Sequence, residues 1–202
     1  MQEIDNSNSA SSAADINTLL KLNQVYLLIL LRYKNYIEEK ENISVAELPT
    51  LVTPKNPSVA KKANEIKSSI SNYIYDLNFT EAALKAFRFV CDDIEETVLP
   101  LQFWLTPEET LKFRIGDITD KSILLCSLFV ALGNPSAKVI VALSTKKTIA
   151  VYYEFSNALT MFEMQSKSVT VYDSKKDMLA RLISDENVSA YEFNDQIYLD
   201  IA

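Results

Sequence analysis

The spacing of apolar residues changes along this 202-residue chain from the period of a helix to that of a strand. In the first part, apolar residues recur three and four positions apart, as they do on one face of an amphipathic helix. Helices are predicted over 16–37, 58–77 and 80–98. After Gly133 the period becomes two, in segments rich in β-branched and aromatic residues. Strands are predicted over 137–143, 148–155, 158–165 and 169–172, followed by a short helix over about 173–183 and a terminal hairpin over 191–201.

The segment between these two parts, residues 104–133, holds both glycines of the chain. Thr106 and Glu109 have the spacing of a capping box, so a short helix is expected after them. Asp117 is a favoured N-cap for a second, strongly apolar helix, and Gly133 fits a left-handed helix end. We therefore predict an α+β fold in which N-terminal helices and a central buried helix pack on an antiparallel β-sheet.

Composition divides the chain into three regions. Residues 1–14 are polar, small and rich in serine, so we expect a disordered tail. Residues 15–57 are expected to form an N-terminal helix and a connection that contains three prolines. Residues 58–202 are then expected to form one domain with enough apolar residues for a full core.

The helix predicted over 16–37 is apolar on nearly every face in its middle. Its apolar run, residues 25–31, is far shorter than the ~20 residues that span a bilayer, and Lys21 and Arg32 flank it, so no membrane span is predicted. Our first interpretation is that this helix is buried against the rest of the protein. The second is that residues 16–37 form a homodimer or dock another partner.

Charge and cysteine content exclude several classes of function. The net charge is −7 and the lysines are scattered, which argues against the basic stripe that binds nucleic acid. The two cysteines lack CxxC spacing and no secretory signal pattern is found, so we expect a cytoplasmic protein. The acidic run at 92–96 is interpreted as a solvated helix face, and neither a metal nor a cofactor is predicted.

The turn at the start of the central helix, residues 116–120, reads Gly-Asp-Ile-Thr-Asp and resembles a known motif. In transglutaminase-like proteins, especially the compact prokaryotic and archaeal forms of this papain-like fold, a tryptophan-and-proline segment leads to a Gly-Asp-Cys-x-Asp turn. The cysteine of that turn opens a buried helix that ends in Leu-Gly, as Leu132 and Gly133 do here. The resemblance implies a transglutaminase-like domain in which Ile118 occupies the nucleophile position.

The chain contains no histidine. A cysteine hydrolase needs an imidazole to take the thiol proton, and a third residue to orient the ring. The resemblance implies that Ala150 occupies the histidine position, because the segment from Ala150 to Glu154 has the spacing of the family's His-x-x-x-Glu strand motif. It also implies that Glu163 occupies the aspartate position. We therefore expect a probable pseudoenzyme, without catalytic activity.

Other side chains could in principle replace this chemistry. Cys126 and Cys91 are interpreted as core residues, because each lies on the inward side of a predicted helix. Lys121 lies beside Thr119 and Ser122 at the start of the central helix. We interpret Lys121 as a surface residue rather than as part of a hydroxyl–lysine pair.

Two functions remain open. The first is a catalytically inactive transglutaminase-like domain that acts as a protein- or peptide-binding or scaffold module. Its expected ligand cleft is lined by Trp104, Asp117, Ile118 and Tyr152. The alternative is a hydrolase or transferase of unrelated mechanism that uses carboxylates or a hydroxyl in the same cleft. Convergence of Lys121, Glu163 and a hydroxyl in an open pocket would favour the alternative.

Overall fold

The computed structural model of the protein describes residues 6–40, 44, 47–98, 103–143, 147–182 and 189–201. Its internal contacts divide the chain into two compact units. The first unit consists of residues 1–42 and 99–103, and the second of residues 43–98 and 104–202.

Two consecutive helices, α1 (Asn6–Arg32) and α2 (Lys34–Lys40), make up most of the described part of the first unit. Because α1 begins at Asn6, the prediction of a disordered tail over 1–14 is wrong for residues 6–14, whereas residues 1–5 lie outside the described part. Once a helix has nucleated, each added residue gains a hydrogen bond at little cost, and alanines at 10, 13 and 14 favour this extension. None of the described helices combines the length and the apolar content that a membrane crossing requires.

The second unit begins before the boundary predicted at residue 58. Within the predicted connection lies α3 (Leu48–Leu51), and Leu48 and Val52 are buried in the main core. The boundary is therefore corrected to residue 43, because these side chains tie the segment to the domain. The next helix, α4 (Pro57–Ser68), has Asn56 as its N-cap and proline at its first position.

The break between α4 and α5 (Tyr75–Asp92) lies earlier than predicted. Asn72 has a φ of 51°, a left-handed conformation that asparagine adopts more readily than most residues. Asn78 then accepts a 2.9 Å hydrogen bond from the backbone N–H of Ile74, which satisfies a free donor at the start of α5. The end also moves: α5 stops at Asp92, and residues 95–96 form a short strand instead of the helix predicted to 98.

Two helices form in the central segment as predicted, α6 (Pro107–Phe113) and α7 (Ile118–Ala131). Thr106 and Glu109 make the predicted capping box at the start of α6. After α7, Gly133 has a φ of 116°, and its N–H donates to the carbonyl of Val130 while the N–H of residue 134 donates to that of residue 129. This pair of bonds is a Schellman motif, which satisfies the last carbonyls of the helix. A small parallel pair of strands connects the chain just after α5 to the turn between α6 and α7: β1 (Glu95–Glu96) and β2 (Ile115–Gly116).

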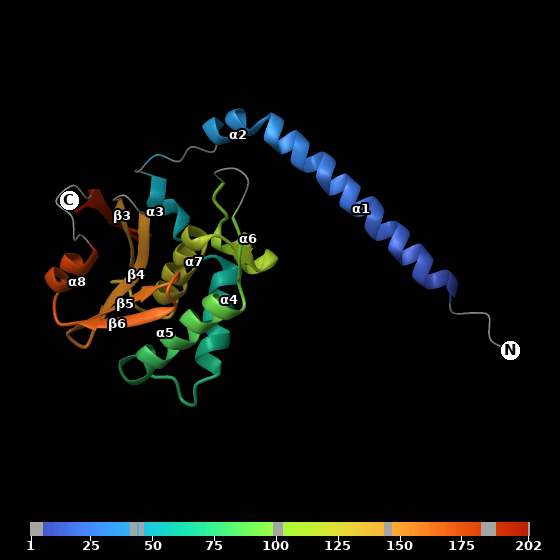
Figure 1. Ribbon diagram of the computed structural model, residues 1–202. Coiled ribbons are helices and arrows are strands. Elements are labelled where there is room, and N and C mark those ends of the chain that lie inside the picture. The colour runs from blue at the N-terminus through green and yellow to red at the C-terminus, as the bar shows by residue number, and fades with distance from the viewer. Residues whose placement is uncertain are drawn as a thin grey trace. The chain divides into compact units, whose positions relative to one another are not determined.

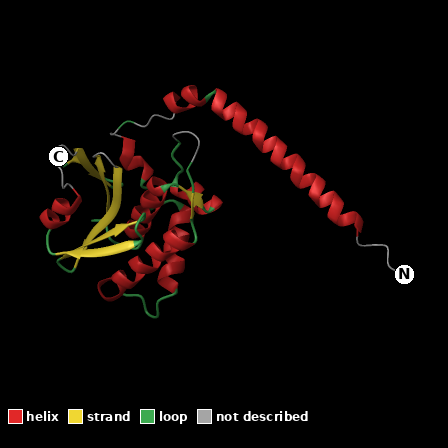
Figure 2. Ribbon diagram, in the orientation of Figure 1, coloured by secondary structure: helices red, strands yellow, loops and turns green. Residues whose placement is uncertain are grey.

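A six-stranded antiparallel sheet forms the second layer, in the order β6-β5-β4-β3-β7-β8. Its strands are β3 (Lys138–Leu143), β4 (Lys147–Phe155), β5 (Ala158–Glu163), β6 (Ser168–Tyr172), β7 (Ser189–Phe193) and β8 (Tyr198–Asp200). A further helix, α8 (Lys175–Leu182), follows β6. The predicted α+β class is confirmed, with helices followed by an antiparallel sheet (Figure 2).

Alternate side chains of the sheet enter two different cores. One face packs on α7, which contacts α4 and α5 on its other side (Figure 1). Four aromatic rings, one each from α5, α7, β4 and β5, meet in this core: Phe79, Phe129, Tyr153 and Phe162. The opposite face packs beneath α8, where Met178 of α8 meets five buried sheet residues: Ile140, Ala150, Tyr152, Leu159 and Met161. The predicted buried helix therefore lies on one face of the sheet, with a smaller core on the other.

Candidate functional site

The first turn of α7 is held by two carboxylates that cap each other's backbone. Asp117, the N-cap, accepts a 2.8 Å hydrogen bond from the N–H of Asp120. Asp120 in turn accepts a 3.0 Å hydrogen bond from the N–H of Asp117. Ile118 follows as the first helical residue and is half-buried against the main core. Ile118, which the sequence resemblance assigns to the nucleophile position, therefore lies at the start of the central helix, as predicted, and its side chain is unreactive.

Asp120 also connects α7 to the segment that contains Trp104. Its other carboxylate oxygen accepts a 3.0 Å hydrogen bond from the N–H of Leu105. Burial and the neighbouring charge of Asp117 raise the pKa of Asp120 to about 7, because both penalise its charged form. Trp104 is half-buried beside this connection, and the ammonium of Lys147 lies 5.7 Å from the centre of its ring. Three of the four predicted cleft residues, Trp104, Asp117 and Ile118, therefore lie at or beside the start of α7. Lys147, which the sequence analysis did not predict, lies beside them.

Tyr152, the fourth predicted cleft residue, lies on the opposite face of the sheet. Successive side chains of β4 alternate between the two cores, so Val151 and Tyr153 face α7 whereas Ala150 and Tyr152 lie beneath α8. The prediction that Tyr152 lines a cleft with Ile118 is therefore wrong. The same alternation removes Ala150 from the face that a histidine would need to occupy.

Glu163 is on the face of α8 as well. Its carboxylate lies 3.8 Å from the guanidinium of Arg181 in α8 and accepts hydrogen bonds of 2.9 Å from Ser166 and Ser168. The prediction that Glu163 stands at the third position of a triad with Ile118 is corrected accordingly. A shift of one residue in each strand gives the positions that do face α7.

Those positions are Ile149 and Met164, which both belong to the core around α7. Extending the register in which Val151 pairs with Phe162 places residue 149 opposite residue 164. They lie at the end of β4 where Lys147 approaches Trp104. Like Ile118, both of these side chains are apolar. The predicted positions retained one carboxylate, that of Glu163, whereas the residues that face α7 in the observed register, Ile149 and Met164, carry no reactive group.

The remaining reactive groups near α7 are committed to structure. Lys121 is almost fully buried and donates a 3.0 Å hydrogen bond to the carbonyl of Ile94, so its interpretation as a surface residue is wrong. Ser122 donates to the carbonyl of Ile118. Cys126 is fully buried, and burial raises its pKa well above the ordinary value, as it does to a smaller degree for Cys91. Both cysteines are unpaired core residues, as the sequence predicted.

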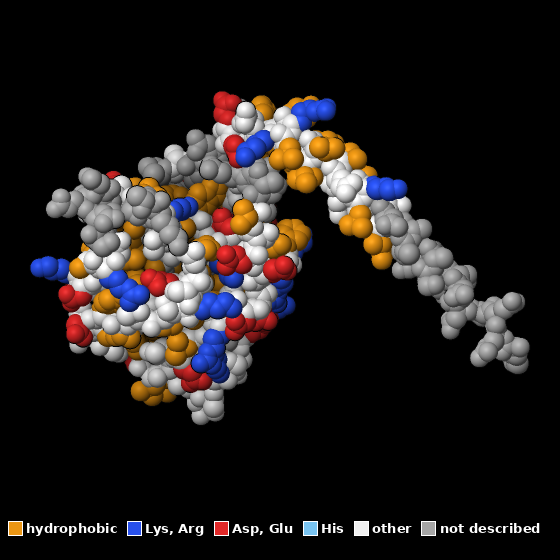
Figure 3. Space-filling model, viewed as in Figure 1, with side chains coloured by type: hydrophobic (Ala, Val, Ile, Leu, Met, Phe, Trp, Pro, Cys, Tyr) orange, Lys and Arg blue, Asp and Glu red, His pale blue; other side chains and the backbone are white. Residues whose placement is uncertain are grey.

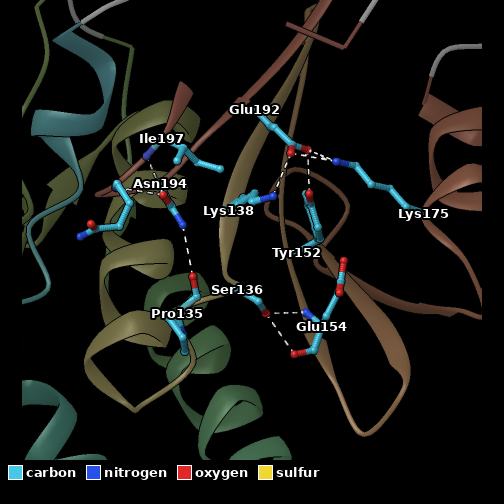
Figure 4. Close-up of polar contacts among 10 residues, drawn as sticks. Pro135, Ser136, Lys138, Tyr152, Glu154, Lys175, Glu192, Asn194 and Ile197 are labelled. Atoms are coloured by element: carbon cyan, nitrogen blue, oxygen red, sulfur yellow. Dashed lines mark hydrogen bonds and ion pairs between the residues drawn. The ribbon is translucent and has the colours of Figure 1, made fainter. Parts of the chain in front are cut away.

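A charged cluster that the sequence did not reveal lies beneath α8 (Figure 4). Glu192 of β7 is fully buried, and its carboxylate contacts the ammonium groups of Lys138 at 2.9 Å and Lys175 at 2.8 Å. Tyr152 donates a 2.6 Å hydrogen bond to the same carboxylate. Burial by itself raises the pKa of Glu192, but the hydrogen bonds from Lys175, Tyr152 and Lys138 outweigh it and hold the pKa below the ordinary value. The carboxylate therefore remains ionised and joins three strands to α8.

An open pocket of about 430 Å³ lies next to this cluster. It is lined by the turn over residues 154–159 and by residues 173–175. The pocket is thus on the face of α8 and not at the start of α7. Among the residues that the structure describes, no three side chains of the metal-binding types come together.

Comparison with known proteins gives a result at the level of fold. The sequence matches no protein-family model, and no curated protein is similar to it. The structure is similar to LapG of Legionella pneumophila, with a TM-score of 0.51 and 16% identity over 78% of this chain and 88% of that chain. EGTA-treated LapG gives a TM-score of 0.50 and 14% identity, over 79% of this chain and 87% of that chain. A structure described as a candidate cysteine protease of Cytophaga hutchinsonii gives a TM-score of 0.46 and 15% identity, over 82% of this chain and 58% of that chain. The start of α7, the sheet behind it and the similarity to LapG indicate the same fold, and the protein has an α+β, papain-like fold.

Proposed function

We propose that the protein is a catalytically inactive form of this fold that binds a protein or peptide, or serves as a scaffold for one. The observation that carries the proposal is the side chain at the start of α7. Ile118 has no group that can attack a carbonyl carbon, and the chain contains no histidine to activate one. Ile149 and Met164, which pack in the core around this helix, are neither acids nor bases.

The proposed binding surface consists of Trp104, Asp117, Ile118 and Lys147. It combines a half-buried indole and an aliphatic side chain with one positive and one negative group. Tryptophan is enriched among the residues that dominate binding energy at protein interfaces, because its large ring buries much area with little loss of side-chain freedom. Peptides with an aromatic or acidic side chain have the chemistry that this surface would bind.

The alternative, an enzyme of unrelated mechanism, has one observation in its favour. A buried carboxyl group with a pKa near neutrality, such as that of Asp120, is a feature of many general acids and bases. Both oxygens of Asp120, however, already accept hydrogen bonds from backbone N–H groups. Lys121 and Glu163, the other groups required, point to Ile94 and to Arg181 respectively.

Enzyme assays test the proposed inactivity. Purified full-length protein, incubated with fluorescent casein and with a glutamine peptide plus an amine probe, is expected to show no proteolysis and no amine transfer from mildly acid to alkaline pH. Activity that disappears in Cys126→Ser would show that a buried thiol is used after all and would overturn the proposal.

A displayed library of random peptides tests the binding surface. Peptides enriched on the full chain are expected to lose binding to Trp104→Ala and to Lys147→Glu, and to keep binding to Leu77→Ala. Leu77 is a matched control because it is a strongly exposed apolar residue of α5. If Trp104→Ala fails to fold, Lys147→Glu still tests the binding surface, because it changes an exposed side chain. Peptides that bind all three variants as they bind the native chain would place the site elsewhere.

We further propose that residues 16–37 mediate association between copies of the chain, and that the protein acts in the cytoplasm. The many exposed apolar side chains of α1 support the first proposal. The two unpaired, buried cysteines are consistent with a reducing compartment. Sedimentation velocity of the full-length protein tests the association, and a fluorescent fusion tests the location.

A further inference from the structure

Apolar side chains are exposed along α1, where they are orange in Figure 3, and also on β6 at the edge of the sheet. Among the residues that the structure describes, no strand pairs with the outer side of β6. Proteins commonly protect such an edge with a charged residue, a proline or a bulge. The five residues of β6, Ser-Val-Thr-Val-Tyr, include no charge and no proline, and they pair with β5 without a bulge. Val169 and Val171 are 38% and 62% exposed.

The backbone groups that β6 turns outward belong to these two valines. In β4, the N–H of Glu154 donates to the hydroxyl of Ser136 and its carbonyl accepts from the same hydroxyl, so both groups point away from β5. These groups point to alternate sides along a strand. Residues 153 and 155 therefore bond to β5, residues 159, 161 and 163 of β5 bond to β6, and residues 168, 170 and 172 of β6 bond back to β5. The N–H and C=O groups of Val169 and Val171 are left to face outward.

A second copy of β6, in antiparallel orientation, fits this edge. Pairing the two strands about Thr170 places Val169 of each copy opposite Val171 of the other, and these two pairs can exchange four hydrogen bonds. The four valines then lie together on one face of the joined sheet. On the other face Thr170 lies opposite its own copy, which is a favourable cross-strand pair. The sequence of the strand is therefore complementary to itself.

The charges at the two ends of β6 support the same register. Lys167 and Asp173 flank the strand and are both exposed. Pairing about Thr170 brings Lys167 of one copy beside Asp173 of the other, at both ends of the joined strands. Either neighbouring register that keeps the outward groups facing each other would place a valine opposite Lys167 or Asp173 instead.

We propose that two copies of the chain pair through β6 about a two-fold axis at Thr170, so that their sheets become continuous. The outward groups need a partner with its own aligned backbone donors and acceptors, which a lipid surface or the side of a helix does not supply. One short strand from each copy makes a small interface, so the dimer is expected to be weak and to form as the concentration rises. The inference is independent of the proposed roles of α1 and of the Trp104 surface.

Disulfide trapping in the full-length protein tests the register. The Cα atoms of the two copies of position 170 come within about 4.5 Å of each other, a distance that a disulfide can bridge. The two copies of position 171 lie roughly 8 Å apart, because they are two residues out of step along the strands. Thr170→Cys is therefore expected to form a covalent dimer under mild oxidation, whereas Val171→Cys stays mostly reduced. The native Cys91 and Cys126 are buried and give the background.

The pair of cysteine variants separates this dimer from association through α1. Association through α1 would bring both introduced cysteines together without preference. Equal cross-linking of the two variants would therefore overturn the β6 dimer and leave the proposal for α1 standing. Cross-linking of Val171→Cys alone would overturn the register, and the absence of cross-linking in both variants would overturn the pairing of β6 altogether.

Charge reversal at the strand ends gives a second measurement. In the Thr170→Cys background, Lys167→Asp and Asp173→Lys are each expected to slow disulfide formation, because each sets like charges side by side, and the double variant is expected to restore it. Lys167 also forms an exposed ion pair with Asp92 at 3.3 Å, which Asp173→Lys does not repair. Restoration in the double variant therefore reports the contact between copies. A double variant as slow as the single ones would overturn the register about Thr170.

Discussion

Tyr152 donates its hydroxyl hydrogen to the carboxylate of Glu192 over 2.6 Å, and both side chains are buried beneath α8. Lys138 and Lys175 complete the shell around this carboxylate. Three residues, from β3, β4 and α8, therefore depend on the negative charge of Glu192 in β7. Replacing that charge is expected to weaken the attachment of α8 to the sheet.

Glu192→Gln is predicted to lower the free energy of unfolding by about 2 kcal/mol or more at pH 7, because two ammonium groups lose their counter-charge in a partly buried site. Glu65→Gln, which removes an exposed ion pair with Lys62, is the matched control and is expected to change it by under about 1 kcal/mol. Urea unfolding followed by circular dichroism measures both. Equal effects of the two substitutions would show that the buried cluster contributes no more than a surface pair.

The effect of Glu192→Gln is also expected to depend on pH. The pKa of Glu192 is held below its ordinary value of 4.5, so its contribution is fully present above that pH and is lost as the pH falls through the folded-state pKa. The difference in unfolding free energy between the native protein and the variant should therefore be largest at neutral pH and shrink below pH 4.5. A difference that stays constant down to strongly acid pH would contradict the assignment.

Asp120 is predicted to make the free energy of unfolding depend on pH in the opposite direction, so that stability falls as the pH rises. Its pKa is raised from 3.8 to about 7, so between these values the folded protein keeps a proton that the unfolded chain releases. Raising the pH across this window therefore costs stability, on the order of 4 kcal/mol at most. Asp120→Asn is expected to lack this decline, whereas Asp173→Asn, at an exposed carboxylate, should retain it. Urea midpoints at several pH values, or the carboxyl carbon shift of Asp120 in NMR, measure the effect. A midpoint near pH 4 in the NMR titration would refute the prediction.

Ile118→Cys is predicted to create a thiol that alkylates faster at neutral pH than the native Cys126, without creating activity. Position 118 is half-buried and meets the free amides at the start of α7, which favour the thiolate. Asp117 and Asp120 oppose this, so the gain should be modest. Iodoacetamide labelling with mass-spectrometric site assignment, and a denatured control, measures it. An introduced thiol no more reactive than Cys126 would mean that position 118 is not the counterpart of a nucleophile.

Gly133→Ala is predicted to lower the free energy of unfolding by about 1–3 kcal/mol, because residues with a side chain rarely adopt its φ of 116°. An added Cβ would also meet the ring of Tyr75 at 3.1 Å. Making the same change in a Tyr75→Leu background separates the two causes, since the backbone cost remains when the ring is removed. Thermal and urea unfolding supply the numbers. A neutral Gly133→Ala would show that the end of α7 can take another conformation.

The sequence by itself determined the class of the longer elements after residue 57 and the helix caps at Thr106 and Asp117. The change of period after Gly133, the capping box at Thr106 and the N-cap at Asp117 are local signals, because they depend on residues within one or two turns of each other. The same local signals placed Ile118 at the start of the central helix, whereas its assignment to a nucleophile position rests on the resemblance alone. Even so, the break between α4 and α5 lies earlier in the chain than the apolar pattern predicted, because the left-handed conformation of Asn72 interrupts the helix there.

The tertiary structure alone decided which strand residues face α7. A strand offers its two faces equally, and a shift of one residue exchanges them, so spacing within β4 could not distinguish Ala150 from Ile149. The partners of Glu192 come from strands and a helix that are distant in the chain. Lys121 can be buried because its ammonium group donates a hydrogen bond to the carbonyl of Ile94. Such contacts depend on how whole elements pack, which carries no signature in the spacing of neighbouring residues.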